Sequence, residues 1–213
     1  MSEFAVIFDM DGVLLDSERA YIDAYMRFAS GYEDIKATTL ACIGANGAKT
    51  REIFLGKYGE DFPFDSYYRQ VTSFVRSHPV PLKPYAEEIL IFLSENHIPI
   101  ALASSTNSAA VHRMLDTAGL TGYFDRLICG DMVSHSKPHP EIFLAAAQAL
   151  GIAPASCMVV EDSYNGIRGA AAAGMHPLMV PDIVQPDDEI RALCDGVFPT
   201  LYEAQEYFFE RIL

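Results

Sequence analysis

The chain has 213 residues and half of them are hydrophobic, so it can fill a sizeable core in one large domain or two small ones. Its 15 Lys and Arg residues against 29 Asp and Glu residues give a formal charge of −14. A globule this acidic repels nucleic-acid phosphates and anionic membranes, and the sequence contains no apolar stretch of bilayer-spanning length. We therefore expect a cytoplasmic protein without a secretory signal, with neither nucleic acid nor membrane as a partner.

The first part of the chain predicts one strand followed by a long helical stretch. The apolar run at residues 4–8 is typical of a buried strand, whereas residues 17–81 contain no convincing strand. Helix-period patterns occupy 18–29, 37–43, 48–58 and 65–77. We expect a helical subdomain inserted after the first strand, with joints near Asp16 and Pro81, where polar residues and prolines suit a hinge.

The remainder alternates apolar runs with helical segments. Each of three predicted helices stops at a glycine, as a left-handed C-cap requires. Continuous apolar strands separated by helices predict a parallel sheet covered on both faces. We predict an α/β fold with a Rossmann-like parallel sheet flanked by helices and an inserted α-helical cap: core residues 1–16 and 82–213, cap residues 17–81. The predicted strands are 98–103, 127–129, 158–160 and 178–180, and the helices are 84–96, 107–118, 140–150 and 165–173.

Carboxylates follow two of the predicted strands. Asp9 and Asp11 come directly after the first strand, and Glu161 and Asp162 come after the fourth. The carboxyl ends of parallel strands meet at one edge of a sheet, so these groups should share a crevice. They would repel one another unless a cation lay among them, and oxygen ligands alone suit Mg²⁺ better than zinc. The sequence therefore predicts a magnesium site formed by Asp9, Asp11, Asp162 and Glu161.

A hydroxyl and an ammonium group reach the same edge. Ser104 follows the second strand and Lys137 follows the third, which gives an anion site suited to a phosphoryl group. In such a site Asp9 can attack phosphorus, and Asp11 can protonate the leaving oxygen and then deprotonate water. Gly12 would permit the tight turn that brings both carboxyl groups to the phosphate.

These residues form four motifs, which stand in order along the chain as FDMDGVLLDS at 8–17, LASS at 102–105, SKP followed by PEIF within 136–143, and VVEDS at 159–163. Taken together they resemble the haloacid-dehalogenase-like superfamily, in the branch with a helical cap after the first motif. That branch includes phosphoglycolate phosphatase and β-phosphoglucomutase, and the resemblance covers nearly the whole chain.

The resemblance implies a role for each matching position. Asp9 would be the nucleophile and Asp11 the general acid and base, with Ser104 and Lys137 binding the phosphoryl group. Mg²⁺ would be held by Asp9, Asp162 and the backbone carbonyl of Asp11, with Glu161 as a ligand or as the partner of one. Substrate contacts are expected from the backbone of Met10 and from Ser105 and Asn107.

The resemblance also favours one reaction over its alternatives. Dehalogenases of the superfamily lack an Asp at the position of Asp11, whose presence favours phosphoryl transfer. Tyr21 stands where β-phosphoglucomutases carry a cap His, and residues 44–51 depart from the Gly-x-x-Arg segment of those mutases. We therefore predict a Mg²⁺-dependent phosphatase acting on a small phosphorylated metabolite. The alternatives are a sugar-phosphate mutase and a non-catalytic binding protein with the same fold.

The cap is expected to select the substrate. Its predicted crevice-facing residues are Ser17, Tyr21, Asn46, Lys49 and Arg51, and either basic side chain could contact the part of the substrate that is not transferred. The alternative for Lys49 and Arg51 is a pair of solvated charges on a helix face. Two domains around a cleft need no partner subunit to complete the site, so we expect a monomer.

Two further patterns have structural interpretations. Ser104 could also cap the helix that follows it. His135 and His139 are four residues apart, the spacing of a metal-binding pair on a helix, but Pro138 and Pro140 argue against a helix there. We therefore interpret both as loop histidines.

Overall fold

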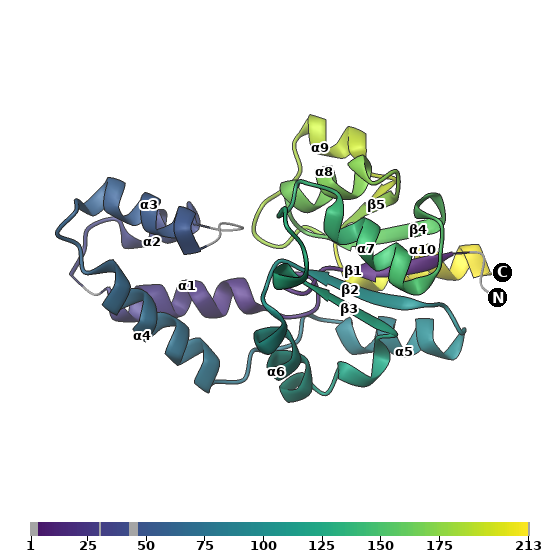
Figure 1. Ribbon diagram of the computed structural model, residues 1–213, viewed down its shortest axis with the longest axis horizontal. Coiled ribbons are helices and arrows are strands. Elements are labelled where there is room, and N and C mark those ends of the chain that lie inside the picture. The colour runs from purple at the N-terminus through teal and green to yellow at the C-terminus, as the bar shows by residue number, and fades with distance from the viewer. Residues whose placement is uncertain (1–3, 30, 43–46, 213) are drawn as a thin grey trace. The chain divides into compact units, whose positions relative to one another are not determined.

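The structure, a computed structural model, describes residues 4–29, 31–42 and 47–212. The chain divides into two compact units (Figure 1). One, which we call the core unit, comprises Met1–Leu15 and Pro81–Leu213, and the other, the helical unit, comprises Asp16–Val80.

The core unit is built on a parallel sheet of six strands among the described residues. The strands are β1 (Ala5–Phe8), β2 (Ile100–Ser104), β3 (Arg126–Cys129), β4 (Cys157–Glu161), β5 (His176–Met179) and β6 (Gly196–Val197). Their order is β3-β2-β1-β4-β5-β6, and Phe8 of β1 lies opposite Leu102 of β2 and Val160 of β4. The predicted α/β fold with a parallel sheet is confirmed.

Helices cover both faces of this sheet. On one face, Ile7 and Val159 pack against Phe143 of α7 and Ala170 of α8. Val6, which alternates with Ile7 along β1, is equally inaccessible to solvent. Figure 1 shows α7 and α8 on one side of the sheet and α5 on the other. The helices of this unit are α5 (Ala86–Glu95), α6 (Ser108–Ala118), α7 (Glu141–Leu150), α8 (Tyr164–Ala172), α9 (Asp188–Leu193) and α10 (Leu201–Ile212).

The predicted glycine stops are present at two of these helices. Gly119 after α6 and Gly151 after α7 adopt left-handed φ angles of 75° and 73°, and each donates its backbone N–H to the last turn of the helix. The third helix, α8, ends at Ala172, and Ala173 is its C-cap residue. Gly174 follows directly and adopts a left-handed φ of 70°. The C-terminal elements β6, α9 and α10 were not among the predicted elements.

The helical unit contains α1 (Ser17–Phe28), α2 (Ile35–Leu40), α3 (Gly47–Tyr58) and α4 (Phe64–Ser77). Its core is an aromatic cluster in which the ring of Phe54 lies 5.5 Å from that of Tyr25 and 5.4 Å from that of Tyr67. The Tyr67 hydroxyl donates a hydrogen bond to the backbone oxygen of Tyr25 at 2.8 Å. This burial of rings from α1, α3 and α4 gives the unit a core of its own.

The two segments of the core unit meet where the first ends, at Leu15, and the second begins, at Pro81. Leu15 and Leu82 form an antiparallel bridge, and the backbone N–H of Lys83 donates to the oxygen of Leu14 at 2.9 Å. The Lys83 ammonium also donates to Asp182 Oδ1, 2.6 Å away, which ties the re-entry point to the segment after β5.

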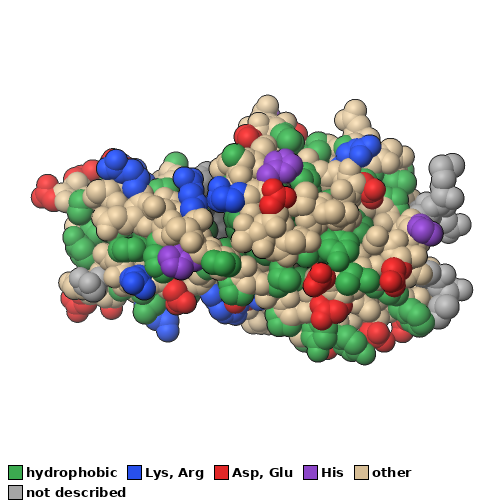
Figure 2. All heavy atoms as spheres, turned by 90° about the horizontal axis from the view of Figure 1, so that it is seen from below, with side chains coloured by type: hydrophobic (Ala, Val, Ile, Leu, Met, Phe, Trp, Pro, Cys, Tyr) green, Lys and Arg blue, Asp and Glu red, His purple; other side chains and the backbone are tan. Residues whose placement is uncertain are grey.

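Charge is dispersed over the surface seen in Figure 2, where acidic side chains are scattered among hydrophobic and neutral ones over the core unit. Among the helices formed by the described residues, none has both the length and the apolar composition needed to cross a membrane.

Candidate active site

The strand order places the candidate site. The order runs outward from β1 in both directions, so the crevice of such a sheet lies at the carboxyl ends of β1 and its neighbours. Asp9 follows β1, and its backbone N–H donates to Val160 of β4 at 2.9 Å. Ser104 ends β2 and Glu161 ends β4. The parallel register thus brings these three residues to one edge.

Lys137 connects three strands at that edge. It lies in the segment between β3 and α7, and its side chain is only 6% exposed. Its ammonium donates to Asp9 Oδ1, to Glu161 Oε1 at 2.7 Å and to the backbone oxygen of Ala103 at 2.9 Å. One buried ammonium group therefore binds two buried carboxyl groups.

Burial and the neighbouring charges determine the protonation of Asp9 and Lys137. Burial raises the pKa of Asp9 to about 8; Lys137 opposes the shift, and the negative charges of Glu161 and Asp11 add to it. Burial alone would lower the pKa of Lys137, but the adjacent carboxylates raise it above its ordinary value. The Lys137 ammonium therefore stays charged, whereas the ionisation of Asp9 depends on the positive charge close to it.

Glu161 is held mainly by hydrogen-bond donors. Its Oε1 accepts from Lys137, and its Oε2 accepts from the backbone N–H groups of Asp162 and Ser163 and from the Ser163 hydroxyl, at 2.8 to 2.9 Å. A Cβ at Gly166 would overlap the Glu161 carboxylate, so only glycine fits there without movement. These contacts favour Glu161 as the residue that positions Lys137, rather than as a direct metal ligand.

Asp162 packs against the turn that follows β1. Gly12 has a left-handed φ of 83°, and a Cβ at this position would overlap Asp162 Oδ2. The tight turn predicted at Gly12 is therefore present, and it brings the first and fourth motifs into contact. Asp9 and Asp162 are each 7% exposed. Two carboxylates with only oxygen donors fit a hard cation such as Mg²⁺.

Asp11 has a partner that the sequence did not indicate. Thr106 donates its hydroxyl to Asp11 Oδ2 at 2.9 Å, while Ser104 Oγ lies 3.5 Å from the same oxygen. The backbone N–H of Thr106 donates to Ser104 Oγ at 3.1 Å. Four polar residues follow β2, and sequence alone does not distinguish which hydroxyl faces Asp11.

A family model described as haloacid dehalogenase-like hydrolase matches residues 5–174 of the chain. The chain belongs to this family. The resemblance inferred from the four motifs is thereby confirmed.

Relatives within the family are similar over most of their length. The chain is 34% identical over 207 residues to the phosphorylated carbohydrates phosphatase of Thermotoga maritima, covering 95% of each chain. It is also 34% identical over 179 residues to the fructose-1-phosphate phosphatase of Escherichia coli K12, covering 80% of this chain and 92% of that one. The crystal structure of a HAD family hydrolase from Deinococcus radiodurans R1 with bound phosphate and sodium matches with a TM-score of 0.83 and 26% identity, covering 98% of this chain and 96% of that one.

Three residues of the core unit were predicted to contact the substrate. The first, Met10, is buried, and its backbone carbonyl accepts hydrogen bonds from the backbone N–H groups of Leu14 and Leu15 in the turn after β1. Ser105 and Asn107 are exposed. The Asn107 side chain accepts from the backbone N–H of Ala110 and caps α6. The interpretation of Ser104 as the helix cap was wrong, because β2 extends through Ser104 and the helix begins only at Ser108.

The predicted substrate-selecting residues lie in the helical unit. Tyr21 packs beside Tyr25, with ring centroids 6.4 Å apart, and Ser17 is buried. Lys49 pairs with Glu52 at 2.7 Å, and Arg51 Nε lies 3.7 Å from Asp65 Oδ1. Asn46 lies outside the described residues. The substrate-binding role of this group stays a prediction.

Proposed function

We propose that the chain is a Mg²⁺-dependent phosphatase that hydrolyses a small phosphate monoester through an aspartyl-phosphate on Asp9. The observation that carries this proposal is the contact of the Lys137 ammonium with both Asp9 and Glu161, beside an Asp11 that is held by Thr106. This arrangement supplies a nucleophile, a fixed cation and a separate acid-base carboxyl group at one sheet edge.

In the first step a carboxylate oxygen of Asp9 attacks phosphorus, and the bond from phosphorus to the ester oxygen breaks. Asp11 gives its proton to the departing oxygen, which leaves as an alcohol. Lys137 offsets the negative charge of the phosphoryl oxygens, and the Ser104 hydroxyl donates a hydrogen bond that orients them. The hydrogen bond from Thr106 holds the Asp11 carboxyl group, so that it does not have to be oriented during the reaction.

In the second step water attacks the same phosphorus atom. Asp11, now ionised, takes a proton from that water, and the bond from phosphorus to the Asp9 oxygen breaks to release inorganic phosphate. Asp9 and Asp162 would hold Mg²⁺, which supplies positive charge that favours the ionised form of Asp9 and offsets the charge of the phosphoryl group.

The substrate class rests on the relatives and on the helical unit. Two relatives are named as phosphatases of phosphorylated carbohydrates and of fructose 1-phosphate, which supports a sugar phosphate or a similar metabolite. We infer that the helical unit acts as a cap and that Lys49 or Arg51 contacts the non-transferred part of the substrate. Replacing each with Ala should then raise KM for the true substrate without lowering kcat, and no effect of either would contradict this assignment.

Phosphate release from a panel of monoesters, measured with Mg²⁺ and with chelator, tests the proposal. The wild-type chain should release phosphate only with Mg²⁺, and Asp9→Asn should abolish turnover. Interconversion of hexose 1-phosphate and 6-phosphate, given a bisphosphate primer and without phosphate release, would favour the mutase alternative. Absence of both activities would favour a binding protein.

A further inference from the structure

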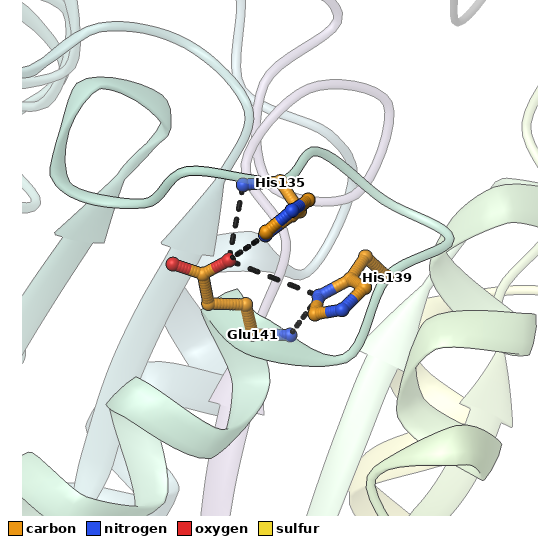
Figure 3. Close-up of side chains that lie close together, drawn as sticks. All are labelled: His135, His139 and Glu141. Carbon is orange, nitrogen blue, oxygen red and sulfur yellow. Dashed lines mark hydrogen bonds and ion pairs between the residues drawn. The ribbon is translucent and has the colours of Figure 1, made fainter.

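The loop that carries Lys137 also brings together three potential metal ligands. His135 and His139 lie on the loop before α7, and Glu141 is the first residue of that helix (Figure 3). Glu141 Oε2 lies 2.7 Å from His135 Nδ1 and 3.8 Å from His139 Nδ1. The imidazole rings stack at 30° with centroids 4.4 Å apart. Although no helix carries the two histidines, as predicted, the loop still directs both rings toward one carboxylate.

The carboxylate at the centre of this group is fixed and charged. Glu141 accepts hydrogen bonds from the backbone N–H groups of Ser134 at 2.8 Å and of His135 at 3.0 Å. These bonds, together with the bond from the His135 ring, hold the pKa of Glu141 below its usual range. The fixed φ angles of Pro138 and Pro140 restrict the backbone on both sides of His139. The three residues are therefore held close together before any cation binds.

We propose that His135, His139 and Glu141 bind a divalent transition cation of the Zn²⁺ class. One ligand atom from each residue lies within 4.8 Å of the others. Bond lengths of about 2.1 Å in a tetrahedral site place ligand atoms about 3.4 Å apart. The two ring-to-carboxylate distances of 2.7 and 3.8 Å lie on either side of that value, and each differs from it by less than about 1 Å.

The donor set distinguishes this site from the proposed Mg²⁺ site. Two imidazoles and one carboxylate suit Zn²⁺, Ni²⁺ or Cu²⁺, whereas Mg²⁺ prefers oxygen ligands alone. The side chains of His135 and His139 are 64% and 51% exposed, so water can reach the remaining coordination position. A cation held here would clamp the loop on both sides of Lys137 and stabilise the folded chain, because only the folded chain brings the three ligands together.

Zn²⁺ binding to the full chain, measured by competition with a chromogenic indicator in excess Mg²⁺, tests the proposal. The wild-type chain should bind one equivalent. His135→Ala and His139→Ala should each weaken binding by at least about tenfold, since loss even of a residue that only supports a ligand costs that much. His176→Ala is the matched control, because the His176 ring already contacts Asp195 at 2.6 Å and the backbone oxygen of Ala155 at 3.0 Å.

The comparison among the variants decides the outcome. His176→Ala should bind Zn²⁺ as the wild-type chain does, and Co²⁺ should give a visible absorption band that is lost in both loop variants. Equal affinity in all four proteins would place the cation elsewhere, and absence of binding by the wild-type chain would overturn the proposal outright. Circular dichroism of each variant establishes that the fold is retained. None of these readouts depends on phosphatase activity.

Discussion

Replacing Lys137 with Met tests the role of the buried cation. The substitution keeps an unbranched side chain of nearly the same length but removes the ammonium that contacts Asp9 and Glu161, whose side chains are 10% and 1% exposed. With a pKa of about 8, Asp9 is largely protonated at neutral pH, so Glu161 is the carboxylate that the substitution leaves without its counter-charge. Removing one partner of a buried ion pair typically costs about 3–5 kcal/mol, because an uncompensated charge stays buried. The free energy of unfolding should therefore fall by about that amount at neutral pH, and phosphate release should be lost.

Lys57→Met is the matched control, because it removes the same charge from an exposed pair. Lys57 lies 3.2 Å from Asp34, with side chains 46% and 61% exposed, and such pairs contribute about 0–1 kcal/mol. Urea unfolding of the two variants beside the wild-type chain gives the comparison. Equal destabilisation by both substitutions would refute the account of Lys137 as a buried counter-charge.

Three further predictions concern the same site. The folded-state pKa of Asp9 is raised from 3.8 to about 8, so its stabilising contribution is present below pH 4 and lost as the pH rises to about 8. In chelator, the wild-type chain should therefore lose more unfolding free energy between pH 5 and pH 8 than Asp9→Asn does, and parallel pH curves would exclude this shift. Gly166→Ala should lower kcat at least about tenfold with the chain still folded, because the new methyl displaces Glu161 and with it Lys137; wild-type kcat would contradict that linkage. Thr106→Val should lower kcat and change its pH profile through the lost hydrogen bond to Asp11, whereas Thr106→Ser should restore both; equal kinetics of the two variants would rule out this positioning role.

The sequence predicted those parts of the fold and site that depend on strong local patterns. Apolar runs before Asp9, Ser104 and Glu161 marked three buried strands, and parallel strands necessarily bring their carboxyl ends to one edge. For this reason the sequence alone predicts that the carboxylates, the hydroxyl and the ammonium group meet at one edge of the sheet. The strand β6 could not, because its two residues, Gly196 and Val197, are half-buried and too few to show a periodicity.

The direction in which a side chain points could not be predicted from the sequence. Ser104 and Thr106 are both hydroxyl residues after the same strand, and only the course of the backbone decides that Thr106 makes the shorter bond to Asp11. His135 and His139 show the same limitation. The prolines correctly argued against a helix, but a loop of fixed backbone angles can also bring two rings together.

The proposed mechanism passes through a covalent phosphoryl group on Asp9, and the Asp11→Asn variant should accumulate this intermediate. With p-nitrophenyl phosphate the leaving group departs without a proton, so this variant should complete the first step and stall at the second, which needs a base. We predict a burst of one nitrophenolate per chain and one phosphoryl group on the peptide that contains Asp9, both absent from the Asp9→Asn/Asp11→Asn double variant. Turnover by Asp11→Asn without a burst, or a phosphoryl group at another residue, would contradict the account.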